Sequence, residues 1–217
     1  HNNLGMALRG LGQEEAAEHS FRSAIALNPR HPKALSNLAN ACRYAGDIAS
    51  GLDYARQATA IARSDPEAFN NLGNAEKDAG LVSDSLVSYQ RAIELDPDFA
   101  LAHWNFSLAL LSAGRFTEGF HEMNWRWRWS KFPGRRPSFD QPEWTGDDLK
   151  GRTLLLYPEQ GLGDMLFMLR FVPAPESTDG RIILELPKAL IPLAKDSHLA
   201  EEIQCPMENR PPFDIHA

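Results

Sequence analysis

The sequence has little cysteine and no long hydrophobic run. Its 217 residues include two cysteines, Cys42 and Cys205, which lie in different regions of the chain. This usage argues against a disulfide framework and favours a reducing compartment, so we expect a cytoplasmic protein. No stretch of about 18 apolar residues occurs and no signal peptide is recognisable, so the sequence predicts no membrane span and no membrane partner.

Basic residues are also scarce. Lys and Arg number 22 against 29 Asp and Glu, which gives a formal net charge of -7. A nucleic-acid-binding surface needs a basic face that neutralises phosphates, so this balance argues against a nucleic-acid partner. The histidines are scattered without the spacing of metal ligands, and the sequence predicts no metal site.

An internal repeat with a step of 34 residues occupies the first part of the chain. An asparagine, a large apolar residue and a small residue recur in that order at Asn3–Gly5, Asn37–Ala39, Asn71–Gly73 and Asn105–Ser107. Further small residues recur at Ala17, Gly51, Ser85 and Gly119. Glycines that can end a helix recur at Gly12, Gly46, Gly80 and Gly114. Each unit is therefore predicted to be a pair of closely packed helices, and the pairs must stack to bury their apolar faces.

This pattern resembles the tetratricopeptide-repeat (TPR) family, whose members form an α-α superhelix and bind peptides or partner proteins. The resemblance covers residues 1–130, with repeats at about 1–31, 32–65, 66–99 and 100–130. The first residues already fit the middle of a repeat, so we expect a fragment of a longer protein. Core packing explains most repeat positions. Cys42, for example, occupies an apolar slot and is expected to be a buried small hydrophobe rather than a nucleophile.

One set of repeat positions is not explained by packing. Four residues, hereafter the asparagine ladder, occupy the same slot of every repeat: Asn3, Asn37, Asn71 and Asn105. Asn40 and Asn74 lie one helical turn further on, and the next turn carries a basic line of Arg9, Arg43 and Lys77. The TPR resemblance implies that these residues line a concave face. An amide offers one acceptor and two donors, so a column of amides can bind the backbone of an extended peptide.

The ladder resembles that of the TPR superhelix in O-linked N-acetylglucosamine transferase. An extended peptide or a protein is therefore the expected partner, and the basic line favours an acidic one. Two alternatives remain open. The asparagines can be helix-capping or solvated residues that the repeat consensus retains. The repeats can also serve self-association, in which two copies stack end to end as a homo-oligomer.

The fourth repeat ends in an unusual stretch. Residues 118–129 include three tryptophans that alternate with two arginines. On a helix this spacing spreads aromatic surface around most of the circumference, so we expect cover on two sides, from repeat three and from the following domain. A nucleic-acid stacking platform is the alternative, which the acidic chain disfavours. Residues 131–151 show no period and are predicted to be a linker, pinned by Phe139, Pro142 and Trp144.

Residues 152–217 follow a different pattern. The apolar run 153–157 predicts a buried strand, and a glycine turn and a helix over 165–172 follow it. A second strand is predicted over 181–186, a second helix over 189–194, and a third strand or a loop over 211–216. Strand, glycine turn, helix and strand form the first βαβ unit of a parallel sheet. The predicted fold class is thus mainly α, a TPR superhelix followed by a partial Rossmann-like α/β segment.

The turn after the first predicted strand is the candidate site of this segment. Gly161 and Gly163 allow a tight turn into a helix N-terminus, which favours an anion or an acceptor group. The dinucleotide fingerprint GxGxxG is absent. Five strings, EGF at 118, WRW at 125, GRTLLL at 151, EQGLGD at 159 and FDIH at 213, resemble one bacterial family. Its members fuse TPRs to a GT-B glycosyltransferase-like domain that is related to heptosyltransferases.

In heptosyltransferase-like enzymes the aspartate of this turn lies at the acceptor site and is a candidate general base. The resemblance gives that role to Asp164, with Glu159 and His216 as weaker candidates. The alternative is that Asp164 caps the following helix. A GT-B enzyme also needs a second Rossmann-like domain for the sugar nucleotide, and residues 152–217 are too few to supply it. We therefore expect no cofactor and no transferase activity in this chain alone, and a sugar nucleotide only for a full-length parent.

Overall fold

The computed structural model describes residues 1–132, 137–159, 161–172, 177–196, 200, 202–206 and 210–217. The chain divides into two compact units, a helical unit at His1–Phe132 and an α/β unit at Pro133–Ala217. This arrangement confirms the predicted fold class. Within the described residues, no helix is long and apolar enough to cross a membrane.

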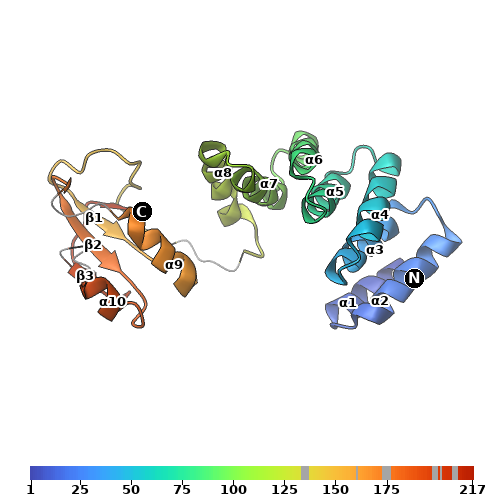
Figure 1. Ribbon diagram of the computed structural model, residues 1–217, viewed down its shortest axis with the longest axis horizontal. Helices are drawn as coiled ribbons and strands as arrows, with labels where there is room; N and C mark the ends of the chain where they lie inside the picture. The colour runs from blue at the N-terminus through green and yellow to red at the C-terminus, as the bar shows by residue number, and fades with distance from the viewer. Residues whose placement is uncertain (133–136, 160, 173–176, 197–199, 201, 207–209) are drawn as a thin grey trace. The chain divides into compact units, whose positions relative to one another are not determined.

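The helical unit consists of four helix pairs that follow one another along the chain (Figure 1). The pairs are α1 (Asn2–Gly10) with α2 (Glu14–Leu27), α3 (Pro32–Tyr44) with α4 (Ile48–Ile61), α5 (Pro66–Asp78) with α6 (Val82–Leu95), and α7 (Ala100–Ser112) with α8 (Phe116–Met123). The turn glycine inside each pair has a positive φ, from +74° at Gly12 to +86° at Gly46. Such a backbone conformation suits glycine, so the predicted turn positions are confirmed.

Small residues on the first helix of a pair make room for large ones on the second. Phe21 and Tyr89 are both fully buried. A Cβ atom placed on Gly5 would lie 2.5 Å from Phe21 Cε1, and one placed on Gly73 would lie 2.6 Å from Tyr89 Cε1. Only glycine admits these rings so close to the helix backbone, which is why the slot stays small along the repeat.

The tryptophan-rich stretch is not one continuous helix. α8 ends at Met123, and the chain continues as a 3-10 helix, η1 (Asn124–Arg128). A 3-10 helix has three residues per turn, so Trp125 and Arg128 eclipse each other, and the guanidinium carbon of Arg128 lies 4.3 Å from the Trp125 ring centroid. The other contact of Trp125 is a parallel stack on His103 of α7, with 3.8 Å between ring centroids.

Aromatic packing closes this end of the helical unit. The ring of Phe132 meets those of Trp104 and Trp127 edge-on, at centroid distances of 5.5 and 5.4 Å. His103 is also held from both sides, because Nδ1 lies 2.5 Å from Glu122 Oε2 and Nε2 lies 3.1 Å from the carbonyl oxygen of Pro97. Trp125 therefore packs on α7 of its own repeat, and Trp127 packs on Phe132.

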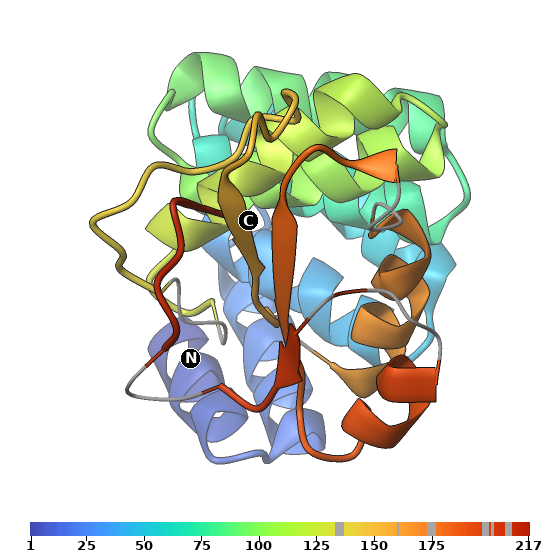
Figure 2. The ribbon, with the colours of Figure 1, turned by 90° about the vertical axis from the view of Figure 1, so that its left-hand side faces the viewer.

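In the part of the α/β unit that the structure describes, a parallel four-stranded sheet has the strand order β3-β2-β1-β4. The strands are β1 (Thr153–Leu156), β2 (Arg181–Glu185), β3 (Glu202–Gln204) and β4 (Ile215–His216), and Figure 2 shows β1 and β2 running side by side. The sequence pattern predicts β1 and β2 but not β3, which has only one apolar residue. Because β2 and β4 flank β1, the order reverses direction there, which is a topological switch point.

One sheet face packs against helices, and residues of the other face are buried as well. α9 (Leu162–Met168), η2 (Leu169–Phe171) and α10 (Ile191–Asp196) follow the first two strands. Leu169 and Ala194 from these helices pack with Leu184 of β2. α9 begins three residues earlier than predicted, inside the glycine turn. On the opposite face, Leu155 and Ile183 are fully buried.

The segment predicted as a linker is fastened to the α/β unit. The Phe139 ring lies 4.7 Å from the His216 ring and 5.3 Å from that of Tyr157, measured between centroids. The backbone N–H of His216 donates to the Pro142 carbonyl at 3.1 Å, and that of Trp144 donates to the His216 carbonyl at 2.7 Å. The expected pinning by Phe139, Pro142 and Trp144 is confirmed for these contacts.

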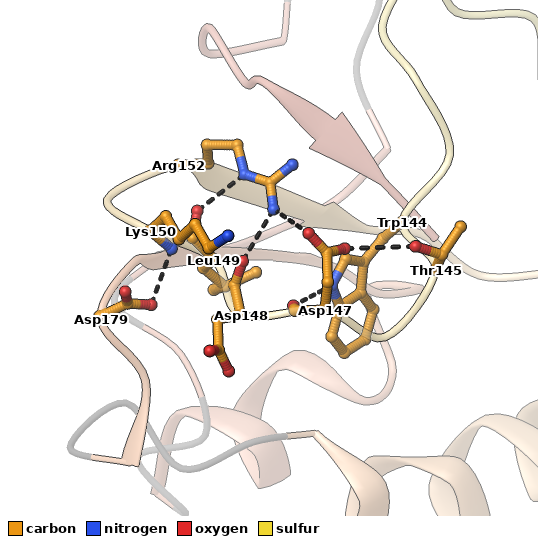
Figure 3. Close-up of polar contacts among 8 residues, drawn as sticks. All are labelled: Trp144, Thr145, Asp147, Asp148, Leu149, Lys150, Arg152 and Asp179. Atoms are coloured by element: carbon orange, nitrogen blue, oxygen red, sulfur yellow. Dashed lines mark hydrogen bonds and ion pairs between the residues drawn. The ribbon is translucent and has the colours of Figure 1, made fainter.

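A hydrogen-bonded turn then leads into β1 (Figure 3). Arg152 donates to Asp147 Oδ2 at 2.6 Å and to the Leu149 carbonyl at 2.7 Å, and Trp144 Nε1 donates to the Asp147 carbonyl at 2.8 Å. The hydrogen bond from Arg152 holds the pKa of the Asp147 carboxyl below its ordinary value. Lys150 adopts a positive φ of 52°, and its N–H donates to Asp179 Oδ1 at 2.8 Å.

Candidate functional site

The first helices of the repeats form the inner side of the helical unit. α1 contacts α3, α3 contacts α5, and α5 contacts α7 across successive repeats. Within residues 1–132, all of which are described, the second helices make no comparable contact with one another. Helices on the inside of a curved stack approach each other more closely than those on the outside. These first helices carry the asparagine ladder, Asn40, Asn74 and the basic line. We call the surface that these residues share the inner face.

The four ladder asparagines differ in exposure. Asn3 is exposed, Asn37 and Asn71 are half-buried, and Asn105 is 9% exposed. Two of them bond across the repeat boundary to the asparagine that precedes the ladder slot of the previous repeat. Asn37 Nδ2 donates to Asn2 Oδ1 at 3.0 Å, and Asn105 Nδ2 donates to Asn70 Oδ1 at 2.9 Å.

These bonds give part of the ladder a structural role. Asn70 is 3% exposed, so the bond from Asn105 satisfies a buried amide oxygen inside the stack. The bond of Asn37 uses one of its two donor hydrogens and leaves its acceptor for another group. Asn37 and Asn71, the ladder residues of the middle repeats, are thus partly exposed to solvent.

The second row of the inner face is engaged in side-chain contacts. Asn40 Oδ1 accepts a hydrogen bond from Arg43 Nη1 at 2.9 Å, and Asn74 Oδ1 accepts one from the Tyr89 hydroxyl at 2.8 Å. Arg43 also forms an ion pair with Asp78, a residue of the next repeat that the sequence analysis does not single out. Arg9 and Lys77, the other members of the basic line, are half-buried on α1 and α5.

Two titratable side chains near this row, Tyr89 and Glu76, have raised pKa values. Burial is the main cause that raises the pKa of the Tyr89 hydroxyl above its ordinary value, while the charge of Arg43 opposes the rise and that of Asp78 adds to it. Burial also raises the pKa of Glu76, whose Oε2 accepts from the Ser88 hydroxyl at 2.6 Å. Tyr89 therefore stays protonated and serves as a hydrogen-bond donor to Asn74.

The glycine turn of the α/β unit follows β1 at the carboxyl edge of the sheet. Gly161 precedes α9 and has a φ of +44°, which favours glycine. Gly163 and Asp164 are exposed in the first turn of α9. Asp164 is thus not the N-cap residue, because Gly161, which has no side chain, holds that position. The carboxylate still lies where a helix N-terminus favours negative charge.

The other edge candidates lie at the ends of β1 and β4. Glu159 is exposed after β1, and His216 ends β4 with 6% exposure. A further polar group, not found from the sequence, is Glu185 at the end of β2. Its side chain is fully buried and its Oε1 accepts from Arg210 Nε at 2.8 Å, while Oε2 has no hydrogen-bond partner among the described residues. The one sequence signal for it is its position directly after the apolar residues 182–184 of the predicted strand.

Among the described residues, no group of three or more His, Cys, Asp or Glu side chains is arranged to hold a metal ion. The structure therefore offers two regions for function: the inner face of the repeats, and the carboxyl edge of the sheet with its glycine turn.

The helical unit matches known families of repeats. The family described as "Tetratricopeptide repeat" matches residues 2–66, and the one described as "TPR repeat" matches residues 73–114. The first TPR of Spaghetti (RPAP3), solved with an HSP90 peptide of sequence SRMEEVD, is 19% identical. The alignment covers 52% of this chain and 90% of that one, with a TM-score of 0.50.

Two longer proteins are similar over most of the chain. Protein FlbA of Caulobacter vibrioides is 28% identical over 200 residues, which is 88% of this chain and 33% of FlbA. A mutant O-GlcNAc transferase of Thermobaculum terrenum shares the fold over 94% of this chain and 40% of its own, with 19% identity and a TM-score of 0.55. The chain thus spans about a third of its curated relative. Its helical unit is a solenoid of tetratricopeptide repeats.

Proposed function

We propose that the inner face of the repeats holds an extended polypeptide through the amides of Asn37 and Asn71. The observation that carries this proposal is the position of these amides. They belong to partly exposed residues, one repeat apart, on the helices that meet along the inner side. An amide binds both the N–H and the C=O of a peptide backbone, so the contact does not depend on the peptide's side chains. The peptide bound to the related TPR of Spaghetti supports the proposal.

Replacing both asparagines tests it. We expect Asn37→Ala/Asn71→Ala to weaken binding of an extended peptide about tenfold or more, because each lost amide removes hydrogen bonds of about 1 kcal/mol each. Thermal stability should change little, since among the described residues the only side-chain hydrogen bond lost is the part-buried one from Asn37 to Asn2. The measurement is fluorescence anisotropy against a panel of labelled extended peptides, with a melting curve for each variant.

A matched control separates the inner face from amides in general. Gln57 on α4 and Gln90 on α6 are exposed amides of the second helices. Gln57→Ala/Gln90→Ala should leave peptide affinity unchanged. Equal affinity of the asparagine double variant and the unaltered protein would exclude the ladder as the binding element. A tendency of the unaltered protein to form dimers or longer chains by light scattering would favour self-association instead.

We also propose that the α/β unit is the acceptor side of a sugar-transferring GT-B domain in a longer protein. The switch point at β1 and the fold shared with an O-GlcNAc transferase over both units support this assignment. In that setting the exposed Asp164 carboxylate can take the proton from an acceptor hydroxyl. The sheet as described offers the turn residues but not a second α/β domain for a sugar nucleotide.

A donor-binding measurement tests this second proposal. We expect UDP-N-acetylglucosamine at millimolar concentration to leave the melting temperature of the 217-residue chain unchanged, because donor contacts belong to the other domain of a GT-B enzyme. A ligand that binds only the folded state must raise it. A clear upward shift, or hydrolysis of the donor by the chain, would contradict the assignment.

A further inference from the structure

The ion pair between Arg43 and Asp78 lies on the inner face. Arg43 reaches from α3 of the second repeat to α5 of the third, where its Nε and Nη2 lie 2.9 and 2.5 Å from Asp78 Oδ2. Its third nitrogen, Nη1, donates to Asn40 at 2.9 Å. Each of the three guanidinium nitrogens therefore has a partner on the inner face itself.

The two partners differ in how they meet solvent. The Arg43 side chain is 9% exposed and that of Asp78 is 31% exposed. The stem of Arg43 packs over Gly51, where an added Cβ would come within 2.7 Å of Arg43 Cγ. The guanidinium is thus fixed by packing, and the carboxylate covers it from the solvent side.

The repeat supplies this carboxylate only once. The slot seven residues after the ladder asparagine holds Tyr44, Asp78 and Ser112 in repeats two, three and four. Each of these residues lies 35 positions after a member of the basic line, as Asp78 does after Arg43. By this register Arg9 is matched with Tyr44 and Lys77 with Ser112. An acid is matched with a base only at the centre of the inner face.

We propose that Asp78 is an internal competitor that occupies the place of an acidic side chain of the bound polypeptide. This inference rests on the proposed peptide-binding function. Nε and Nη2 of Arg43 both contact a single oxygen of Asp78. A carboxylate of the bound peptide can instead place one oxygen on each of these two nitrogens, and this bidentate geometry is stronger. An acidic peptide displaces Asp78 and a neutral one does not. Asp78 therefore lowers the affinity for acidic sequences and leaves the backbone contacts of the ladder unaffected.

The test uses two labelled peptides of twelve residues, one alternating Ser with Glu and one alternating Ser with Gln. We expect Asp78→Asn to raise the affinity for the Ser-Glu peptide about tenfold and to leave that for the Ser-Gln peptide unchanged. Arg43→Gln should abolish the preference for the acidic peptide in either background. Because Asp78→Asn also changes the net charge, Asp53→Asn on α4 serves as the control with the same charge change and should give a much smaller gain.

Each other outcome overturns the inference in a recognisable way. An unchanged affinity of Asp78→Asn for the acidic peptide, or an equal gain in Asp53→Asn, shows that Asp78 does not compete. If Asp78→Asn lowers the melting temperature and weakens the binding of both peptides, the ion pair only stabilises the contact between the two repeats. If neither peptide binds any variant, the proposed function fails and the competitor role fails with it.

Discussion

Arg210→Ala is expected to destabilise the α/β unit by about 3 kcal/mol, because the fully buried Glu185 carboxylate loses its ion-pair partner, whose own side chain is 26% exposed. Glu185 is fully buried at the end of β2. Arg210 Nε lies 2.8 Å from its Oε1, and Gln204 Nε2 contacts the same oxygen at 3.5 Å. Without Arg210 the carboxylate stays in a low-dielectric site beside one weak donor. Urea unfolding followed by circular dichroism measures the loss.

Two further variants show whether the uncompensated charge is the cause. Arg181→Ala removes an ion pair with Glu202 on the same sheet, but these side chains are 53% and 31% exposed, so the expected cost is below about 1 kcal/mol. Glu185→Met/Arg210→Met removes both charges and should recover most of the stability. If Arg210→Ala and Arg181→Ala proved equally mild, the pair at Glu185 would not hold the sheet edge.

Gly73→Ala is expected to lower the free energy of unfolding of the repeats by about 1–3 kcal/mol, because it overpacks a filled core. The new methyl group would lie 2.6 Å from Cε1 of Tyr89, which is fully buried and bonded through its hydroxyl to Asn74. The ring cannot move away without breaking that bond. Chemical unfolding with an unchanged denaturant slope would report the loss directly.

The chain contains a matched control for this substitution. Gly10 ends α1, and a Cβ placed there would meet nothing within 4 Å. Gly10→Ala should therefore be neutral or slightly stabilising, since alanine favours helix. Gly73→Ala/Tyr89→Leu should be less destabilised than the sum of its single changes, because the smaller side chain relieves the clash. Strictly additive changes in the free energy of unfolding would show that the contact with Tyr89 does not cause the loss.

The repeats could be predicted from the sequence because a 34-residue period repeats the same evidence of packing in each unit. The small slot at Gly5 and Gly73 and the turn at Gly12 and Gly46 were predicted by residue type alone, and the rings and positive φ values that require them are present. Tyr89 fills the large slot as expected. Repetition turns weak local preferences into a firm assignment.

Contacts between repeats could not be predicted in the same way. The bonds from Asn37 to Asn2 and from Arg43 to Asp78 join residues 35 apart, one more than the period. Their formation depends on how far each helix is shifted against the next. Nothing in the sequence therefore indicated that Arg43 is already paired with Asp78.

The α/β unit shows the opposite limits. β1 and β2 were predicted because they are apolar on both faces, as buried parallel strands are. β3 was missed because Glu202–Gln204 has a single apolar residue, and its place in the sheet depends on pairing with β2. The 3-10 helix after Met123 could not be predicted from a stretch that reads as a continuous helix, and the stack of Trp125 on His103 in this helix joins residues 22 positions apart.

The side-chain amide resonances of Asn37 and Asn71 test the central claim most directly. Nitrogen-15 spectra recorded during titration with the Ser-Gln peptide would follow them, with Gln57 and Gln90 on the second helices as internal references. We predict saturable shifts of both asparagine amides and none of the glutamine amides. Saturable binding that leaves both asparagine resonances unmoved would contradict it.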